Sequence, residues 1–207
     1  MAMEEGVETK ISGVVNWVRK NNVFIQDNTG GFLLYGSDLA PEVGTKIIAK
    51  GKRGAFNGSP QLSGTVIEAT EAATLYAPAN LTLADLFADT TALKYFGQRV
   101  QVLGVKVAEY DSKGNVYLTD GTHKIKGHYM VPDQAVFTVG KKVDIVAVAS
   151  QYQGTVQFEG DVAGLTVTVI GLKDPYAYPT RGENNQYKLE NRWVISNVME
   201  NFAANAP

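Results

Sequence analysis

The sequence predicts an all-β chain made of two small five-stranded barrels in tandem. Two observations support this prediction. Short runs rich in Val, Ile, Phe and Tyr recur along the 207 residues, and Gly, Asn and Asp bound them. These runs also form two sets in the same order, so that FNGSPQL (56–62) returns as YQGTVQF (152–158). Several matched segments in one order indicate an internal duplication.

The first set of runs predicts a barrel at residues 1–73. Its strands are expected at 9–18, 22–27, 31–36, 45–53 and 61–70. The segment DLAPEVG (38–44), before the fourth strand, is interpreted as a loop or one helical turn. Five strands with a short helical element before the fourth is the order of an OB fold, a small Greek-key barrel.

A helix and a second barrel are predicted at residues 74–171. The helix is expected over about 82–90, with Thr82 as its N-cap and Asp85 at the third helical position. The strands of this barrel are expected at 99–110, 115–120, 123–129, 141–150 and 156–170.

Residues 172–207 belong to neither barrel and form a C-terminal extension. One or two strands are expected within 187–202. We expect the extension either to pack on the second barrel or to lead into a further domain.

Several short patterns resemble a family of bacterial OB-fold modules that occur in tandem on extracytoplasmic or surface proteins. In the first repeat they are Gly13-Val14, Val23 to Gly30, Gly44 to Ile47, and Phe56 to Leu62. The second repeat keeps Tyr117, Asp120 and Tyr152 to Phe158 but has Gly-Thr-His at 121–123, where the first has Asn-Thr-Gly. The resemblance implies an OB fold of the nucleic-acid-binding type and a location outside the cytoplasm or on the bacterial cell surface. It also implies a helical lead-in to the second barrel.

The composition of the chain limits which partners and which cellular locations can be expected. The formal net charge is −2, whereas strong nonspecific nucleic-acid binders are usually basic. The absence of cysteine excludes disulfides and thiolate chemistry. It fits a bacterial protein outside the cytoplasm, although many cytosolic proteins also lack cysteine. No apolar run is long enough to span a bilayer. The polar start MAMEEGVETK has no signal-peptide pattern, so the expected location rests mainly on the resemblance.

No catalytic, metal or cofactor site is predicted. The two histidines, His123 and His128, fall on opposite faces of an extended segment. Asp27 and Asp120 lie where strands enter turns, which favours bonds to turn amides over catalysis. DSKGN (111–115) is interpreted as a hairpin turn and not as a calcium loop. We therefore expect a binding module that is not an enzyme.

The predicted binding surface is the outer face of strands 2 and 3 with loops 1–2 and 4–5, which OB folds use for ligands. Gln26 is expected to face water, so alternation places Phe24 on the same exposed face and turns Val23 and Ile25 inward. Tyr117 takes the matching exposed position of the second repeat, and an exposed ring at this position suits base or sugar stacking. Alternation also places Lys124, Lys126 and His128 on one face. The candidate ligand-binding residues are Phe24, Gln26, Arg53, Phe56, Asn57, Tyr117, Lys124, Lys126, His128 and Tyr152.

A structural role is open for each of these residues. The other barrel or a neighbouring loop can cover the rings, and the lysines can serve as solvated protection of a sheet edge. Asn57-Gly58 is also a strong tight-turn pair. The leading ligand is single-stranded nucleic acid, and the alternative is a carbohydrate- or protein-interaction or spacer module.

Overall fold

The computed structural model describes residues 5–130 and 137–160, and the backbone of short strands at 166–170, 180–181, 187–189 and 192–193. The chain divides into two compact units, Met1–Ile170 and Gly171–Pro207. Among the described residues, no helix is long and apolar enough to cross a membrane.

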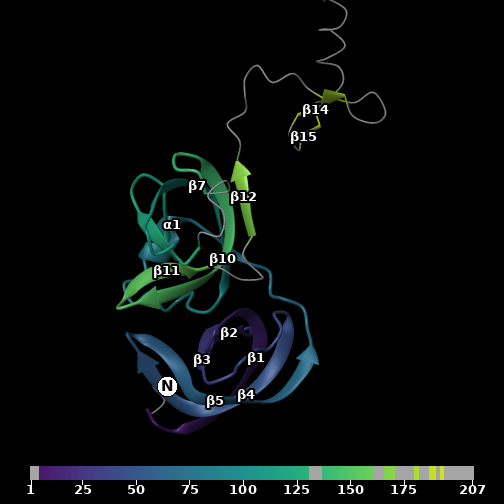
Figure 1. Cartoon of the computed structure of the whole chain (residues 1–207), viewed down its shortest axis with the longest axis vertical. Coiled ribbons are helices and arrows are strands. Elements are labelled where there is room, and N and C mark those ends of the chain that lie inside the picture. Colours follow the sequence, from purple (N-terminus) through teal and green to yellow (C-terminus); the bar gives the residue numbers. More distant parts are fainter. Residues whose placement is uncertain are drawn as a thin grey trace, which may run out of the picture. The chain divides into compact units, whose positions relative to one another are not determined.

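The first five strands close a barrel (Figure 1). They are β1 (Glu8–Arg19), β2 (Asn22–Gln26), β3 (Gly31–Tyr35), β4 (Thr45–Phe56) and β5 (Ser59–Ala72). The order around the barrel is β1-β2-β3-β5-β4, and only the β3–β5 pair is parallel. This confirms the five predicted strands, and 38–44 forms a loop without a helix. The interior is apolar and includes Val15, Val23, Ile25, Leu34, Ile47, Ala49 and Leu62.

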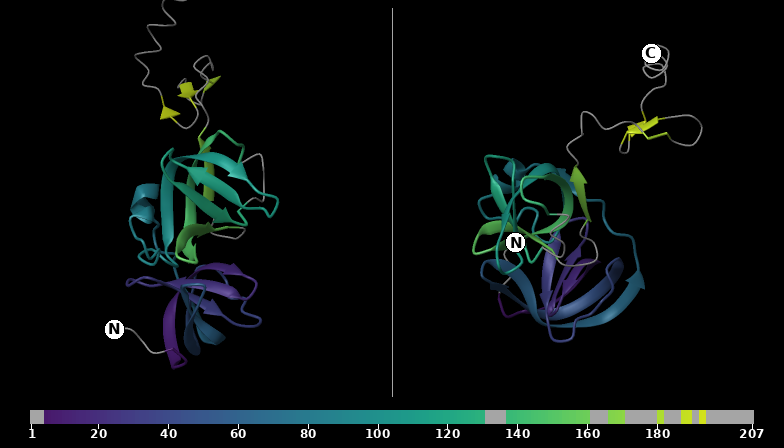
Figure 2. Two further views of the ribbon diagram at one scale, coloured as in Figure 1. Left: turned by 90° about the vertical axis from the view of Figure 1, so that its left-hand side faces the viewer. Right: turned by 45° about the horizontal axis from the view of Figure 1, so that its top comes forward.

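A second sheet follows, in the order β12-β10-β11-β9-β8-β7-β6, with an additional pairing of β10 to β7 (Figure 2). Its strands are β6 (Ala79–Leu81), β7 (Arg99–Tyr110), β8 (Val116–Thr119), β9 (Lys124–His128), β10 (Lys142–Tyr152), β11 (Thr155–Glu159) and β12 (Thr166–Ile170). Strands β7 to β11 repeat the pairing of β1 to β5, including the parallel pair β9–β11. The single strand predicted at 156–170 is two strands, β11 beside β9 and β12 beside β10.

The predicted helix is short. Helix α1 (Leu83–Phe87) begins after Thr82, whose hydroxyl accepts a hydrogen bond from the Asp85 amide while the Asp85 carboxylate accepts one from the Thr82 amide. This reciprocal capping box stabilises the first turn. Leu83 and Leu86 are buried in the core of the second sheet. The helix ends at Phe87, before the predicted end near residue 90. The Asp89 carboxylate accepts hydrogen bonds from the Leu93 and Lys94 amides, and these bonds turn the chain.

The second unit contains a small antiparallel sheet of β13 (Thr180–Arg181), β14 (Tyr187–Leu189) and β15 (Arg192–Trp193). Strands β14 and β15 fall within the predicted range 187–202. The remainder of that range lies outside the described residues, and packing of the extension on the second barrel stays a prediction.

Within the first unit, the first barrel and the second sheet share a small core. It is formed by Trp17, Phe24 and Leu33 on one side and by Phe96 and Val148 on the other. The Phe24 ring lies 5.4 Å from Trp17 and 5.3 Å from Phe96, centroid to centroid. Tilted and edge-on aromatic pairs of this kind add to the stabilisation from burial. This core fixes how the first barrel and the second sheet face each other.

Candidate nucleic-acid interface

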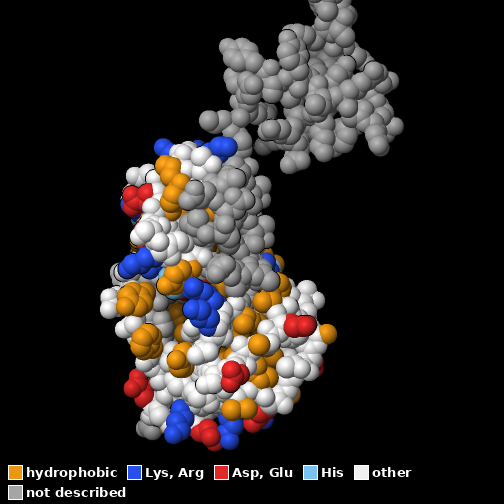
Figure 3. All heavy atoms as spheres, in the orientation of Figure 1, with side chains coloured by type: hydrophobic (Ala, Val, Ile, Leu, Met, Phe, Trp, Pro, Cys, Tyr) orange, Lys and Arg blue, Asp and Glu red, His pale blue; other side chains and the backbone are white. Residues whose placement is uncertain are grey.

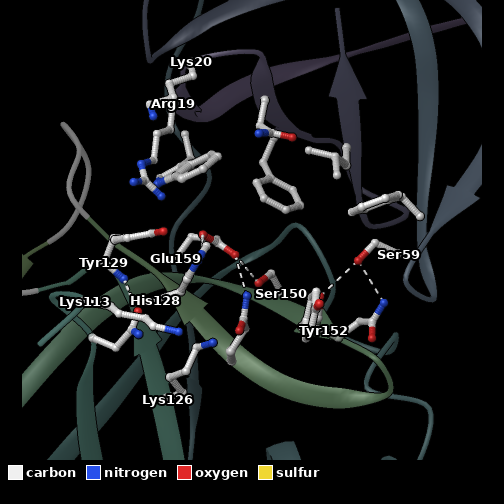
Figure 4. Close-up of a pocket in the computed structure, with 18 of the residues that line it drawn as sticks. Arg19, Lys20, Ser59, Lys113, Lys126, His128, Tyr129, Ser150, Tyr152 and Glu159 are labelled. Atoms are coloured by element: carbon white, nitrogen blue, oxygen red, sulfur yellow. Dashed lines mark hydrogen bonds and ion pairs between the residues drawn. The ribbon is translucent and has the colours of Figure 1, made fainter. Parts of the chain in front are cut away.

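A groove of about 580 Å³ lies between the first barrel and the second sheet, beside the shared core (Figure 4). The first barrel contributes the end of β1, the β1–β2 turn, the first half of β2, the middle of β3, and the tip of the β4–β5 hairpin. The second sheet contributes the β7–β8 turn, β8, β9, the β10–β11 hairpin and β11. The lining residues are Trp17, Arg19, Lys20, Asn22, Phe24, Leu33, Phe56, Ser59, Asp111, Lys113, Asn115, Tyr117, Lys126, His128, Tyr129, Ser150, Gln151, Tyr152, Gln157 and Glu159.

Phe24 does not present its ring freely, which corrects the expectation that it is an exposed stacking residue. The predicted alternation is right, since Val23 and Ile25 point into the barrel core and Phe24 points out of it. However, Phe96 and Val148 cover the ring, and Phe24 is only 3% exposed. The other half of the unit therefore covers it, and its role in the groove is structural support of the floor.

Gln26 is also buried and serves the same junction. Its side-chain oxygen accepts hydrogen bonds from the Asn16 amide group, at 3.3 Å, and from the Arg99 backbone N–H, at 3.0 Å. Asn16 in turn donates to the Gly97 carbonyl oxygen, at 2.7 Å. The expectation that Gln26 faces water is wrong, because β7 begins directly against it.

The two repeated hairpins meet at their tips. Asn57-Gly58 and Gln153-Gly154 each have positive φ at both positions, which is the geometry of a type I′ turn. The Gln151 side chain donates to the Ser59 hydroxyl, at 2.8 Å, and to the Asn57 carbonyl, at 3.2 Å. The Gln153 backbone N–H also donates to that carbonyl, at 2.9 Å. Asn57 thus acts through its backbone as turn and joint, and its side chain does not line the groove.

Aromatic rings line the rim above this joint. Phe56 and Tyr152, at matching positions of the two hairpins, are 64% and 48% exposed. The Lys126 ammonium lies 5.9 Å from the Tyr152 ring centroid, and the Arg19 guanidinium lies 3.8 Å from that of Tyr129. Tyr117 is half-buried on the wall of the groove. Such rings offer flat faces on which bases or sugars stack.

The net charge of the side chains that line the groove is positive. Arg19, Lys20, Lys113 and Lys126 line it, and none of the four forms an ion pair among the described residues. Two acids also line the groove, so basic side chains outnumber acidic ones by two. One of the acids, Asp111, accepts a side-chain hydrogen bond from Asn115, which holds the pKa of that carboxyl below its usual range and so favours its ionised form. Basic side chains gather beside apolar ones on the face shown in Figure 3.

The second acid, Glu159, lies at the bottom of the groove in a polar cluster. Its Oε1 accepts from the Ser150 hydroxyl, at 2.6 Å, and from the Gln157 amide, at 2.9 Å. Its Oε2 lies 3.0 Å from His128 Nδ1. A buried carboxylate needs such partners, because desolvation of an unpaired charge is costly. His128 therefore belongs to the groove, as predicted, but is tied to an acid.

Two of the remaining candidate residues do not line the groove. Lys124 forms an exposed ion pair with Glu109 and lies 5.1 Å from the outer side of the Tyr117 ring. Arg53 lines a separate, smaller cavity of about 240 Å³ at the end of the first barrel, beside Asp27. The structure thus brings together Phe56, Tyr117, Lys126, His128 and Tyr152 over the Phe24 floor, and leaves out Gln26, Arg53, Asn57 and Lys124.

The turn aspartates behave as the turn interpretation predicts. Asp27 accepts from the Thr29 and Gly30 amides. Asp120 accepts from the amides of His123, at 2.7 Å, and Thr122, at 2.8 Å, and its other oxygen lies 3.0 Å from His123 Nδ1. These bonds, with the His123 amide foremost, lower the pKa of Asp120 to about 2. In the described ranges no group of three or more His, Asp or Glu side chains could hold a metal ion.

Several lining residues were not among the candidates. In the sequence, Gln157 and Glu159 are ordinary strand positions, since only the pairing of β11 beside β9 brings them next to Lys126 and His128. Tyr129 has positive φ at the end of β9 and was not singled out. Arg19 and Lys20 had a local signal, because they form the predicted 1–2 loop of an OB fold, the loop that commonly contacts ligands.

Comparisons with known proteins show only distant likenesses. No family model matches the chain, and no curated protein matches it. Among solved structures, the p204 HINb domain is 12% identical with a TM-score of 0.37, over 81% of this chain and 100% of that one. A structure described as "Structural mimicry for functional antagonism" is 11% identical with a TM-score of 0.38, over 77% and 92%. A multidomain protein with nucleic-acid-binding domains from Streptococcus pneumoniae TIGR4 is 12% identical with a TM-score of 0.23, over 84% of this chain and 50% of that one. The functional argument therefore rests on the groove itself.

Proposed function

We propose that this chain is a non-enzymatic module of two tandem OB-fold barrels that binds single-stranded nucleic acid in the groove between them. One observation carries the proposal. A single groove is lined by four basic side chains without ion-pair partners among the described residues and by four aromatic rings outside the shared core, those of Phe56, Tyr117, Tyr129 and Tyr152. Basic side chains that follow a backbone, together with rings that stack on bases, are the combination that binds single strands.

The topology supports two OB folds. The pairing of β1 to β5 recurs in β7 to β11, including the parallel contact between the third and fifth strands of each set. OB folds lend strands 2 and 3 with loops 1–2 and 4–5 to their ligands. In both sets these segments supply the groove lining, so the two ligand surfaces converge on one site.

The aromatic rings favour an unpaired strand. Phe56 and Tyr152 expose their faces at the rim, and a base can stack on such a face only when it is free of its own helix. The overall charge of −2 does not oppose this, because a local cluster of charge sets the potential inside a groove.

A fluorescence-anisotropy titration with labelled 15-nucleotide single strands tests the proposal. If three or four of the basic side chains each meet a phosphate, raising salt from 50 to 200 mM weakens binding by about 20- to 50-fold. Absence of binding at 50 mM salt, or affinity that ignores salt, would reject nucleic acid as the ligand. A glycan array and a protein-capture assay then examine the alternative module function.

A matched pair of lysine variants locates the site. Lys126→Ala removes a groove charge and should lower both the affinity and the steepness of its salt dependence. Lys106→Ala removes an exposed lysine on β7, outside the groove, and should change neither. Equal effects of the two variants would place the ligand elsewhere. The extracytoplasmic location stays a prediction.

A further inference from the structure

The carboxylate of Glu159 has no function in a site that only attracts phosphates, because both groups are negatively charged. It is 7% exposed, lines the groove, and lies between Arg19 and Lys20 on one side and Lys113 and Lys126 on the other (Figure 4). A fixed negative charge there lowers the affinity for any strand through repulsion of phosphates. A role in base recognition would give this charge a function, because a carboxylate accepts a hydrogen bond from the amine of a base.

Among the described residues, the hydrogen bonds of Glu159 leave one of its acceptor sites unfilled. An ionised carboxylate has about four lone-pair sites, two on each oxygen. Oε1 accepts two hydrogen bonds, from Ser150 and Gln157, whereas Oε2 accepts one, from His128, among the described residues. Gln157 also keeps a second amide hydrogen, since the bond to Glu159 uses one of two.

The Glu159 acceptor beside the Gln157 donor can distinguish bases by the order of donors and acceptors on their pairing edges. Cytosine presents an exocyclic amine donor next to the N3 acceptor, and adenine presents the same order on its pairing edge. Carboxylates accept from the cytosine amine in base recognition. Uracil and thymine present the reverse order, with an oxygen where the amine stands, so they would bring that oxygen against the carboxylate.

We propose that Glu159 and Gln157 read the pairing edge of one unpaired base, so that the groove prefers the amino bases cytosine and adenine over uracil and thymine. Residues 157 and 159 lie on the same face of β11, two positions apart, and their side chains are hydrogen-bonded to each other. His128 and Ser150 act as positioning residues that hold the carboxylate. This inference rests on the proposed function and deepens it.

The sharpest probe is a pair of equally long oligonucleotides, oligo-dC and oligo-dU, at pH 7.5. The two bases differ only in the amine or oxygen at position 4 and the matching hydrogen at N3. We expect the unaltered protein to bind oligo-dC about tenfold more tightly, the lower part of the range for discrimination by one good side-chain contact. Equal affinity for the two would overturn the inference while leaving the proposed function intact. No binding of either would reject the proposed function.

The variant Glu159→Gln tests which residue reads the base. The amide can still accept from Ser150 and Gln157 but can now donate to the uracil oxygen. We expect the tenfold preference to fall to twofold or less, or to invert, because oligo-dC loses the carboxylate acceptor while oligo-dU gains a donor for its oxygen. A preference that survives unchanged would assign Glu159 to structure alone.

A second test changes the oligonucleotide and not the protein, so its result does not depend on whether Glu159→Gln folds. Oligo-dC with two methyl groups on N4 has no amine hydrogens to donate, while the protein is unaltered. It should bind about as weakly as oligo-dU. Binding as tight as that of ordinary oligo-dC would overturn the inference, whatever the stability of Glu159→Gln.

Discussion

At the scale of single residues, the groove separates rings that stabilise the fold from rings that are free for a ligand. Phe24 is enclosed by Trp17 and Phe96 and is nearly inaccessible. Phe56 and Tyr152 are about half exposed or more and occupy hairpin tips. Truncation of the first ring should therefore cost stability, and truncation of the other two should cost binding.

Phe56→Ala and Tyr152→Ala should each weaken single-strand binding by about 1–3 kcal/mol, the usual contribution of one stacked base. The melting temperature should change little, since each ring is largely in solvent. Anisotropy titrations and thermal melts measure the two quantities. Tyr35→Ala removes a ring of similar exposure outside the groove and serves as the control. A lowered melting temperature with unchanged affinity would assign both rings to packing.

Asp120 gives a prediction on pH. Its folded-state pKa of about 2 lies below the ordinary value of 3.8, so its ionised form favours the folded state. That contribution is fully present above about pH 4 to 5, and it is lost as pH falls through 2. Asp120→Asn should lower the melting temperature at pH 7, and the difference from the unaltered protein should shrink between pH 4 and pH 2. A difference that persists at pH 2 would trace it to packing and not to charge.

At the scale of secondary-structure elements, the two repeated hairpins are more than turns. Their sequence similarity is explained by the type I′ geometry that Asn-Gly and Gln-Gly adopt. Their tips are joined by hydrogen bonds from Gln151 and Gln153 to the opposite hairpin. The same segments that place Phe56 and Tyr152 therefore also close one end of the groove.

Gln151→Ala should destabilise the protein by about 1–3 kcal/mol, because it leaves the buried Ser59 hydroxyl with one partner fewer and removes one of the two hydrogen bonds to the Asn57 carbonyl. Denaturant unfolding measures this free energy. Thr155→Ala, at an exposed position on β11, is the control and should cost a few tenths of a kcal/mol at most. Equal stability of the two variants would show that the joint is not energetically coupled to folding.

The sequence predicts the elements well and the site only in part. Alternation assigns Val23 and Ile25 to the core, and Asn57-Gly58 marks its turn, because those signals are local. Burial of Phe24 and Gln26 is not local, since it depends on Phe96 and Arg99, more than seventy residues away along the chain. For the same reason, no local pattern points to Glu159, which meets His128 only through the parallel pairing of β9 with β11.

At the scale of the whole first unit, two glycines permit the close contact between the first barrel and the second sheet. The backbones of Gly31, at the start of β3, and Gly97, before β7, approach so closely that a Cβ on Gly31 would overlap the Gly97 backbone. The Gly97 carbonyl accepts from Asn16, and its amide donates to the Ala149 carbonyl. The groove thus depends on a contact to which no ligand-facing side chain contributes.

Gly31→Ala should therefore weaken nucleic-acid binding without altering any lining residue. The added methyl group collides with backbone, which cannot rotate away as a side chain would, so the two halves must shift apart. Overpacking of this kind typically costs about 1–3 kcal/mol in stability. We expect a larger radius of gyration by small-angle scattering and an affinity reduced at least tenfold by anisotropy. Gly54→Ala is the matched control, because Gly54 also lies in a strand without positive φ and its added Cβ meets no atom within 4 Å. If Gly31→Ala binds as tightly as Gly54→Ala, the groove does not depend on how the first barrel and the second sheet meet, and each barrel must bind its ligand alone.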